Sequence, residues 1–276
     1  MKKVLGLVVS NRKLGNSEIL VKEIMRNIPG DCQRQLIRVT DLKLEACKAC
    51  YHCLQPDAGC KAHDDFNFIM DSIKKADAVI IGVPVYILGP HGYFKLLQDR
   101  LVGAYNYTKF TAGKPCVIVV PFGTIGWTGY SKAAVNIFPR TLEMKLIDTW
   151  MVHATLPAES LLDEKNLAYA RDLGQRVFGG EEYRPGRREC PQCGSDIFRL
   201  LDGNRVECPI CDAVGVLGED SIPDFSACTH NRFSHHEIEE HFHEYLAQMR
   251  ARFKAEKDIL KGLQKEYKEM DWWIKP

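Results

Sequence analysis

Short apolar runs alternate with amphipathic stretches across residues 3–180. The run at 78–83 reads Ala-Val-Ile-Ile-Gly-Val without a polar side chain, which is typical of a strand buried on both faces of a sheet. Such strands, separated by helices, predict a parallel sheet with helices on both of its faces. The five strands are expected at 3–9, 35–39, 78–83, 115–120 and 146–153, and the five helices at 17–27, 66–75, 92–102, 131–144 and 164–178.

The pattern changes after the fifth helix, where Pro185 and Gly186 mark a linker. A cysteine-rich segment at 188–215 follows, and a charged helical pattern then runs from 234 to 272. In this last segment apolar residues recur at steps of three and four, which gives a seam that needs a partner surface. We therefore expect three parts, at 1–180, 188–215 and 234–272.

The long C-terminal helix carries a signal at each end. Ser234 and Glu237 form a capping box at its start. We expect the helix to build an oligomer interface or to pack over the first part, with Trp272 and Trp273 as buried anchors.

Charge and hydropathy argue against several classes of function. Lys and Arg number 37 against 36 Asp and Glu, so no global field would attract nucleic acid or an anionic membrane. The first apolar run ends after six residues, which is too short for a signal sequence. No eighteen apolar residues follow one another, so no membrane span is expected. We expect a cytosolic protein, in which eleven cysteines favour metal or redox chemistry over disulfides.

Four cysteines are closely spaced between the second and third strands, at Cys47, Cys50, Cys53 and Cys60. Thiolates at these spacings on a turning backbone can face one iron–sulfur cluster. A zinc knuckle also uses cysteines, but three of them at successive two-residue gaps fit a cubane better than the paired ligands of Zn²⁺. This first cysteine set therefore predicts electron transfer rather than hydrolysis or group transfer.

A second cysteine set consists of two C-x-x-C pairs separated by fourteen residues. Between the pairs, Asp202-Gly203-Asn204 signals a hairpin. The arrangement predicts a tetrahedral four-thiolate site in a zinc ribbon, and rubredoxin-type iron is an alternative because it uses the same ligands. Nearby arginines are offset by acidic residues, so nucleic-acid binding is not expected. The four ligands are Cys190, Cys193, Cys208 and Cys211.

Three loops at the carboxyl ends of strands carry polar or flexible residues. The loop at 10–17 places hydroxyls, an amide and a guanidinium at the start of a helix, where backbone N–H groups favour phosphate. It lacks both strong phosphate-loop patterns, so an ordinary capped turn explains this loop equally well when it is taken alone. The loops at 82–92 and 121–129 add Pro, Gly and aromatic residues that suit a flat ring. Because the carboxyl ends of parallel strands share one sheet edge, we expect the loops to form one ligand site.

Together these loops resemble the flavodoxin-like NADPH-dependent FMN reductases. The resemblance rests on S-x-R-K-x-G-N-S from Ser10, P-V-Y from Pro84 and K-x-x-x-D-R from Lys95, and it departs at Val9 and Val83. It implies a doubly wound α/β fold that binds FMN. By this resemblance Ser10, Arg12, Asn16 and Ser17 would bind the FMN phosphate, Pro84, Val85 and Tyr86 would hold the isoalloxazine edge, and Gly123, Thr124 and Gly126 would close the other side.

The first cysteine set, followed by His63-Asp64-Asp65-Phe66, is similar to the iron–sulfur flavoproteins of the same superfamily. Their motif holds a [4Fe–4S] cluster beside FMN, although similar cysteine loops occur in flavin reductases that have no cluster. The resemblance covers 1–180 and implies a homodimer or homotetramer, in which the cluster of one subunit approaches the flavin of another.

These features predict a flavodoxin-like α/β domain with a zinc ribbon and a long C-terminal helix, acting as an FMN-dependent oxidoreductase. The predicted function is electron transfer from ferredoxin or a similar redox protein, through [4Fe–4S] and FMN, to a small-molecule acceptor. Two alternatives stay open. One is an NAD(P)H-dependent FMN or quinone reductase without a cluster, and the other is a non-enzymatic redox sensor whose ribbon binds a protein partner.

Overall fold

The computed structural model describes residues 1–55 and 57–274. Its main domain is a parallel sheet of five strands in the order β2-β1-β3-β6-β7, which is the flavodoxin-like order and confirms the predicted fold class. The strands are β1 (Lys2–Val8), β2 (Cys32–Arg38), β3 (Ala78–Gly82), β6 (Pro115–Phe122) and β7 (Lys145–His153).

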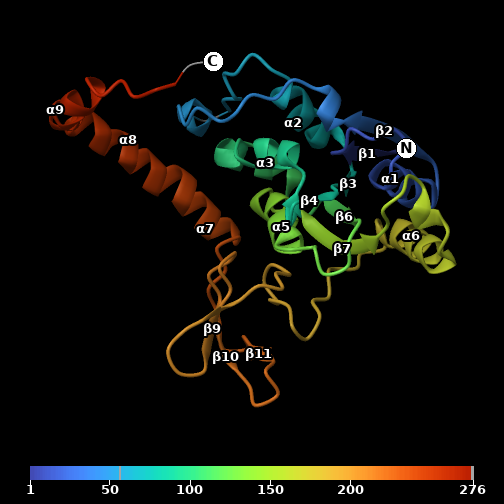
Figure 1. Cartoon of the computed structure of the whole chain (residues 1–276). Helices are drawn as coiled ribbons and strands as arrows, with labels where there is room; N and C mark the ends of the chain where they lie inside the picture. The colour runs from blue at the N-terminus through green and yellow to red at the C-terminus, as the bar shows by residue number, and fades with distance from the viewer. Residues whose placement is uncertain (56, 275–276) are drawn as a thin grey trace.

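Helices cover both faces of this sheet (Figure 1). Along β1, Leu5 and Leu7 pack into one apolar core, and Val4 and Val8 pack into the other. The first core is closed by α2, α3 and α5, and the second by α1 and α6. These helices are α1 (Asn16–Arg26), α2 (Phe66–Lys75), α3 (Gly92–Gln98), α5 (Ser131–Thr141) and α6 (Glu164–Arg176).

Several elements of this domain differ from the prediction, and α5 ends at Thr141 rather than at 144. The helix expected at 92–102 ends at Gln98, a 3-10 turn follows at Leu101–Gly103, and an additional helix, α4 (Tyr105–Thr111), comes next. Residues 105–111 are mostly Thr, Tyr and Asn, which have low helix propensity, so no periodic signal marks α4. Strand β2 begins at Cys32 rather than at 35, because it is an edge strand with exposed side chains and lacks an apolar run there.

The cysteine-rich segment forms a small antiparallel sheet in the order β11-β10-β9-β8, below the main domain in Figure 1. Its core contains the second cysteine set together with Val206 and Phe225. Gly203, at a φ of +75°, lies in the turn between β8 and β9 that the sequence signals as a hairpin. The strands are β8 (Arg199–Leu200), β9 (Arg205–Glu207), β10 (Val214–Leu217) and β11 (Pro223–Asp224).

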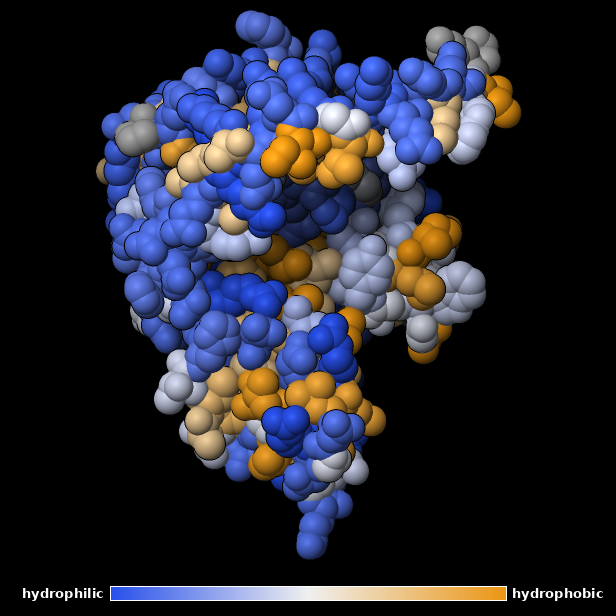
Figure 2. All heavy atoms as spheres, turned by 90° about the vertical axis from the view of Figure 1, so that its left-hand side faces the viewer, coloured by the Kyte–Doolittle hydropathy of each residue, from blue (hydrophilic) through white to orange (hydrophobic). Residues whose placement is uncertain are grey.

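The C-terminal helix begins against α4, where the Tyr105 hydroxyl donates to Glu239 Oε1 at 3.1 Å, and it then extends away from the main domain (Figure 1). Figure 2 shows hydrophobic residues among the hydrophilic ones on this side of the molecule. The expectation of one uninterrupted helix is wrong. A π-helical turn (Glu240–Tyr245) separates α7 (His235–Glu239) from α8 (Leu246–Ala255), and Glu256 leaves helical geometry at φ −95° and ψ 5° before α9 (Lys257–Lys268). Few tertiary contacts hold this helix straight, since only Ile238 of its apolar seam is buried.

The structure agrees with the prediction for the start of this helix only in part, and it contradicts the prediction for the end of the helix. The hydroxyl oxygen of Ser234 accepts a hydrogen bond from the Glu237 N–H at 3.3 Å, which confirms Ser234 as the cap. The reciprocal half of the predicted capping box is not formed, because the Ser234 N–H donates to the Asn231 carbonyl oxygen at 2.8 Å. The side chains expected as buried anchors are exposed in the single chain, Trp272 by 82% and Trp273 by 81%, because no part of residues 1–55 and 57–274 packs closely on them. Within the described part of the chain, no helix combines the length and the apolar character needed to cross a bilayer.

Candidate functional site

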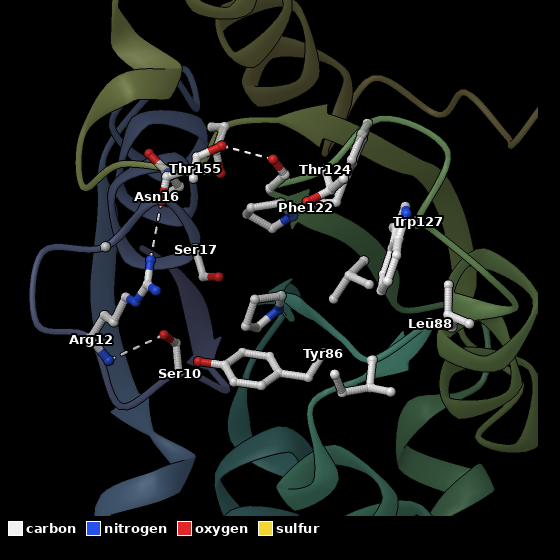
Figure 3. Close-up of a pocket in the computed structure, with 17 residues that line it drawn as sticks. Ser10, Arg12, Asn16, Ser17, Tyr86, Leu88, Phe122, Thr124, Trp127 and Thr155 are labelled. Carbon is white, nitrogen blue, oxygen red and sulfur yellow. Dashed lines mark hydrogen bonds between the residues drawn. The ribbon is translucent and has the colours of Figure 1, made fainter.

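A pocket of about 330 Å³ lies at the carboxyl ends of β1, β3 and β6, where the three predicted loops meet (Figure 3). Nine of the ten residues predicted to bind FMN line it, and Gly126 does not. The sequence reasoning missed Phe122, Trp127, Ala154 and Thr155, which also line the pocket. The last two could have been found, because they follow β7 and the carboxyl ends of parallel strands share one edge.

At one end of the pocket the N-terminus of α1 is uncapped. Gly15 precedes the helix in an extended conformation, and no side chain accepts from the first N–H groups. Ser10 and Ser17 lie beside them and are almost fully buried. Arg12 covers this end, where its Nη1 donates to the Thr155 carbonyl oxygen at 3.1 Å. Free N–H groups, the helix dipole and a guanidinium together make an anion site.

An ion pair between Glu18 and Arg38 supports this loop. Glu18 Oε2 accepts a hydrogen bond from the Leu14 N–H at 2.7 Å, and Arg38 Nη1 donates to the Ser10 carbonyl oxygen at 2.8 Å. Burial alone would raise the pKa of Glu18, but hydrogen bonds from Lys22, Leu14 and Arg38 lower it to about 2. Glu18 is therefore ionised at neutral pH and fixes the backbone of the anion site.

Asn16 acts as a support for the neighbouring loop. Its Nδ2 donates to the carbonyl oxygens of Ala154 and Leu156 at 3.2 and 2.9 Å. Its Oδ1 accepts from the N–H and the hydroxyl of Ser160 at 3.2 and 3.0 Å. With the side chain fully engaged, the backbone N–H of Asn16 is the group that faces a ligand at the helix N-terminus.

The other end of the pocket is apolar and open. Tyr86 lies on the hairpin of β4 (Val85–Tyr86) and β5 (Gly89–Pro90), and Trp127 lies on the loop after β6 (Figure 3). The Tyr130 N–H donates to the Leu88 carbonyl oxygen at 2.9 Å and ties this loop to the hairpin. The contact requires Gly129, whose φ is +53° and whose Cβ, if present, would lie 2.0 Å from the Leu88 oxygen.

The first cysteine set lies on the loop between β2 and α2, around a second cavity of about 250 Å³. Ala49 and Tyr51 have left-handed φ values of 47° and 54°, and these turn the backbone between the cysteines. Cys53 and Cys60 are partly buried, and the remaining two are exposed. All four cysteines, Cys47, Cys50, Cys53 and Cys60, line this cavity.

Two asparagines hold the cysteine loop in place. Asn106 Nδ2 donates to the carbonyl oxygens of Cys53 and Gln55 at 2.8 and 3.0 Å. Asn67 pairs with the backbone of Cys60, donating to its carbonyl oxygen at 2.8 Å and accepting from its N–H at 3.1 Å. Burial raises the pKa of the Cys53 thiol to about 11, with a further increase from Cys60. An electropositive ion would therefore be needed to keep this sulfur as a thiolate at neutral pH.

The second cysteine set forms a compact buried group, in which the four sulfurs lie within 4.8 Å of one another. The Cys190 and Cys211 sulfurs are 3.4 Å apart, and those of Cys193 and Cys208 are 3.5 Å apart. Sulfurs bound tetrahedrally to Zn²⁺ at ~2.3 Å stand roughly 3.8 Å apart, so the set fits a single ion. Contact with the Cys190 sulfur raises the pKa of Cys193 and Cys211, a cost that a bound cation would remove.

A comparison with known families shows which family the chain belongs to. The family model for NADPH-dependent FMN reductase matches residues 2–156, a stretch that contains every residue lining the pocket. The chain belongs to this family. Its members are FMN-dependent oxidoreductases, which agrees with the fold and with the flavin site predicted from the loops.

Several relatives of this FMN reductase family member are iron–sulfur flavoproteins. One from Methanocaldococcus jannaschii is 34% identical over 99 residues, which are 36% of this chain and 51% of that protein. Another, from Archaeoglobus fulgidus, is 25% identical over 176 residues, 63% of this chain and 78% of that protein. A flavone synthase of Aspergillus candidus is 26% identical over 183 residues, 56% of this chain and 57% of that protein. The match thus spans about half the length of the first and third of these relatives.

Solved structures extend the likeness in fold beyond the family stretch. A flavone reductase superposes with a TM-score of 0.75 at 20% identity and covers 99% of both chains, so its fold includes counterparts of the ribbon and the C-terminal helix. An NAD(P)H:quinone oxidoreductase from Methanothermobacter marburgensis covers 66% of this chain and 98% of its own, with a TM-score of 0.51 at 15% identity.

The residues of the pocket fit FMN. Its anion site at the start of α1 suits a phosphate, and its open end beside Tyr86 and Trp127 suits a flat ring system. The first cysteine set fits a cluster of several irons better than one ion. Within residues 1–55 and 57–274, only the second set brings its ligand atoms as close as 4.8 Å. Cysteines that each bind a different iron must stand further apart than four ligands of one ion.

Proposed function

We propose that this FMN reductase family member accepts electrons from ferredoxin or a similar protein at a [4Fe–4S] cluster on Cys47, Cys50, Cys53 and Cys60, and reduces a small acceptor at FMN. When bound, the flavin supplies exchange between one-electron and two-electron chemistry, and the cluster supplies one-electron transfer. The observation that carries the proposal is the presence of a pocket with an anion site and an open apolar end, and of a four-cysteine cavity, on the same domain.

The side chains of the pocket would divide the work of holding the flavin. We assign the phosphate to Ser10, Ser17, Arg12 and the backbone N–H of Asn16, in keeping with the anion site at the start of α1. We assign the ring to the segment from Pro84 to Tyr86 and to the loop with Gly123 and Thr124. Trp127 lies at the rim and would shield the ring from water.

The exposure of the cysteine loop supports a protein donor. Cys47 and Cys50 are exposed, so a redox protein could approach the cluster closely without opening the fold. The pocket rim is apolar, with Ile87 and Trp127 exposed by 85% and 57%, which favours a flat and neutral acceptor. We further propose that the exposed seam of the C-terminal helix pairs in a homodimer or homotetramer, and that the protein works in the cytoplasm.

For the second cysteine set we propose a structural Zn²⁺. Its four sulfurs are fully buried and leave no open coordination position for a substrate, which is typical of structural sites. Rubredoxin-type iron is the alternative, because its ligands are the same.

A second candidate function is NAD(P)H-dependent reduction of a flat conjugated carbonyl compound without any cluster. Two similar proteins favour it, since one is named a flavone synthase and the other a flavone reductase. In that case NAD(P)H would bind over the open end of the pocket, and the first cysteine set would be inert.

Anaerobic purification followed by metal analysis separates these functions. We expect about four irons per chain and a broad absorbance near ~400 nm that bleaches on reduction. Cys50→Ala should remove both while leaving FMN in place, and Cys32→Ala, which changes a partly buried cysteine of β2 outside both sets, should change neither.

Retention of iron and of donor-dependent reduction in Cys50→Ala would show the cluster assignment to be wrong. Flavin absorbance alone, with rapid NAD(P)H oxidation, would establish the second candidate. Binding of a protein partner in only one redox state, without turnover, would instead indicate a sensor.

A further inference from the structure

A buried ion pair lies directly behind the first cysteine set. Arg100 and Asp64 form it, with side chains exposed by only 1% and 0%. Asp64 also accepts hydrogen bonds from the Glu45 and Phe66 N–H groups at 2.8 and 3.2 Å, so it fixes the backbone on both sides of the cysteine loop. The Arg100 guanidinium stacks over the Phe66 ring at 4.3 Å. The pair therefore has a fixed position next to the cysteine cavity.

One nitrogen of this guanidinium, Nη2, has no hydrogen-bond partner among the described residues. Arg100 Nη1 contacts Asp64 and donates to the Glu45 carbonyl oxygen at 3.4 Å, but Nη2 is buried without a hydrogen-bond partner among the described residues. Unsatisfied buried donors are rare, and one on a charged group destabilises the fold. Such a donor points to a ligand that is not a protein atom.

The surroundings identify what that ligand can be. Arg100 lines the cavity of the first cysteine set. All four cysteines of the first set line the same cavity. The unpaired Nη2 thus belongs to a side chain in the wall of a cavity bordered by sulfur ligands, where an inorganic sulfide or a thiolate would accept its N–H.

We propose that Arg100 is a positioning residue of the iron–sulfur site, which donates from Nη2 to a sulfur atom of the bound cluster and favours the reduced cluster through its charge. The proposal rests on the cluster assigned under the proposed function. On reduction the cluster gains one electron, the protein donor loses one, and no bond is made or broken. The added negative charge lies next to a fixed, buried cation, which solvent screens less than it screens an exposed one.

Asp64 provides a matched test because it holds the same structure with the opposite charge. Arg100→Gln removes the positive charge and should lower the equilibrium constant for cluster reduction about tenfold, which for a one-electron couple is ~59 mV. Asp64→Asn should leave that constant unchanged or raise it. Lys61→Gln changes an exposed cation on the same cavity and should alter the constant less than about twofold, because solvent screens it.

The measurement is an anaerobic potentiometric titration of the cluster absorbance in the full-length protein, which needs no acceptor and no turnover. Equal equilibrium constants for Arg100→Gln and wild type would overturn the proposal. Equal shifts in Arg100→Gln and Asp64→Asn would also overturn it, because a pair with only a structural role predicts the same effect whichever partner is replaced. Arg100→Lys keeps the charge, so its equilibrium constant for cluster reduction should lie close to that of the wild type.

Removal of one partner from a buried ion pair can prevent folding. If Arg100→Gln does not fold, the comparison is made between Asp64→Asn and the double variant Asp64→Asn/Arg100→Gln, which leaves no unpaired charge. The double variant should again be about tenfold harder to reduce, and equality would overturn the proposal. Wild-type protein without iron would contradict the proposed function itself, whereas an iron-loaded wild type with an unshifted Arg100→Gln contradicts only the role of Arg100.

Discussion

The two cysteine sets have four thiols each but differ in almost every physical respect. The first lies on an irregular loop with two exposed members, and its sulfurs surround a cavity. The second is fully buried, and its sulfurs are in contact at 3.4 and 3.5 Å. Sulfurs in contact suit a single ion that holds a fold together. Sulfurs spread around an accessible cavity suit a larger cofactor that exchanges electrons with a partner.

An arginine of the main domain lies near each set, and it is fully buried only at the first. Arg100 lies behind the first set, and Arg140 of α5 lies near the second, where Cys193, Cys190 and Cys211 act to raise a pKa that burial lowers. Both arginines have one buried nitrogen without a partner in the described chain, Nη2 and Nε respectively. Each cysteine set thus lies near a cation of the main domain, which would offset the negative charge of thiolates if a metal binds.

The strongest test of this difference between the two cysteine sets removes one ligand from the second set. Cys208→Ser should abolish metal binding and unfold the ribbon, because metal-binding free energies of about 10 kcal/mol are coupled to folding in sites of this kind. Metal analysis should show the loss of one ion, and hydrogen exchange should show the loss of protection in β9 and β10. Cys228→Ser is the control, since this cysteine packs against the ribbon core outside the four sulfurs. Wild-type metal content in Cys208→Ser would mean that the two sets do not differ as described.

A smaller effect is expected from adding a methyl group at Gly103, behind the first cysteine set. A Cβ at Gly103 would lie 2.7 Å from the Cys53 Cβ and 3.1 Å from its sulfur. Gly103→Ala should therefore displace the loop, cost about 1–3 kcal/mol of unfolding free energy and reduce the iron content. Gly92→Ala, at the start of α3 with nothing within 4 Å of the added carbon, should affect neither the chemical denaturation midpoint nor the iron. An unchanged iron content in Gly103→Ala would show that the position of Cys53 does not affect cluster binding.

The attachment of the ribbon to the flavin domain should be weaker than the metal site. Asn136 of α5 is fully buried, and its Nδ2 donates to the carbonyl oxygens of Cys193 and Gly194 at 3.1 and 3.3 Å. Asn136→Ala should cost about 2 kcal/mol and expose the linker at 180–188 to limited proteolysis, while the metal stays bound. Asn166→Ala, which removes a side-chain hydrogen bond to the Ser160 carbonyl oxygen far from the ribbon, should not increase linker cleavage. Release of metal from Asn136→Ala would show that docking and metal binding are one event.

The smallest effect concerns the thiols of the first cysteine set in iron-free protein. Because burial raises the pKa of Cys53 from 9.0 in the unfolded chain to about 11, folding favours its neutral thiol. This contribution to stability is present below about pH 9 and is lost as the pH rises toward about 11. At pH ~8, iodoacetamide should label the exposed Cys50 at least about tenfold faster than Cys53, as followed by mass spectrometry. Equal labelling rates would show that Cys53 is as accessible as its exposed neighbour.

Much of the main domain could be predicted because its signals are local. The apolar runs placed β3 and β7 within one residue, and α2 begins and ends where the pattern predicts. The three strand-end loops meet in one pocket because parallel strands deliver their carboxyl ends to one edge. The broken C-terminal helix could not be predicted, since helical periodicity continues across Glu256 and only missing tertiary contacts leave it free to bend there.

The sequence by itself determined which sulfurs belong together, because ligands two residues apart on a turn stay close in any fold. Only the tertiary structure decided how far apart those sulfurs stand, which is what separates a cluster site from a single-ion site. It also decided that Asn16 supports a loop and that Arg100 meets Asp64 behind the cysteines, across 36 residues of chain. Contacts at such separations depend on how helices and loops pack on the sheet, and local spacing carries no record of that packing.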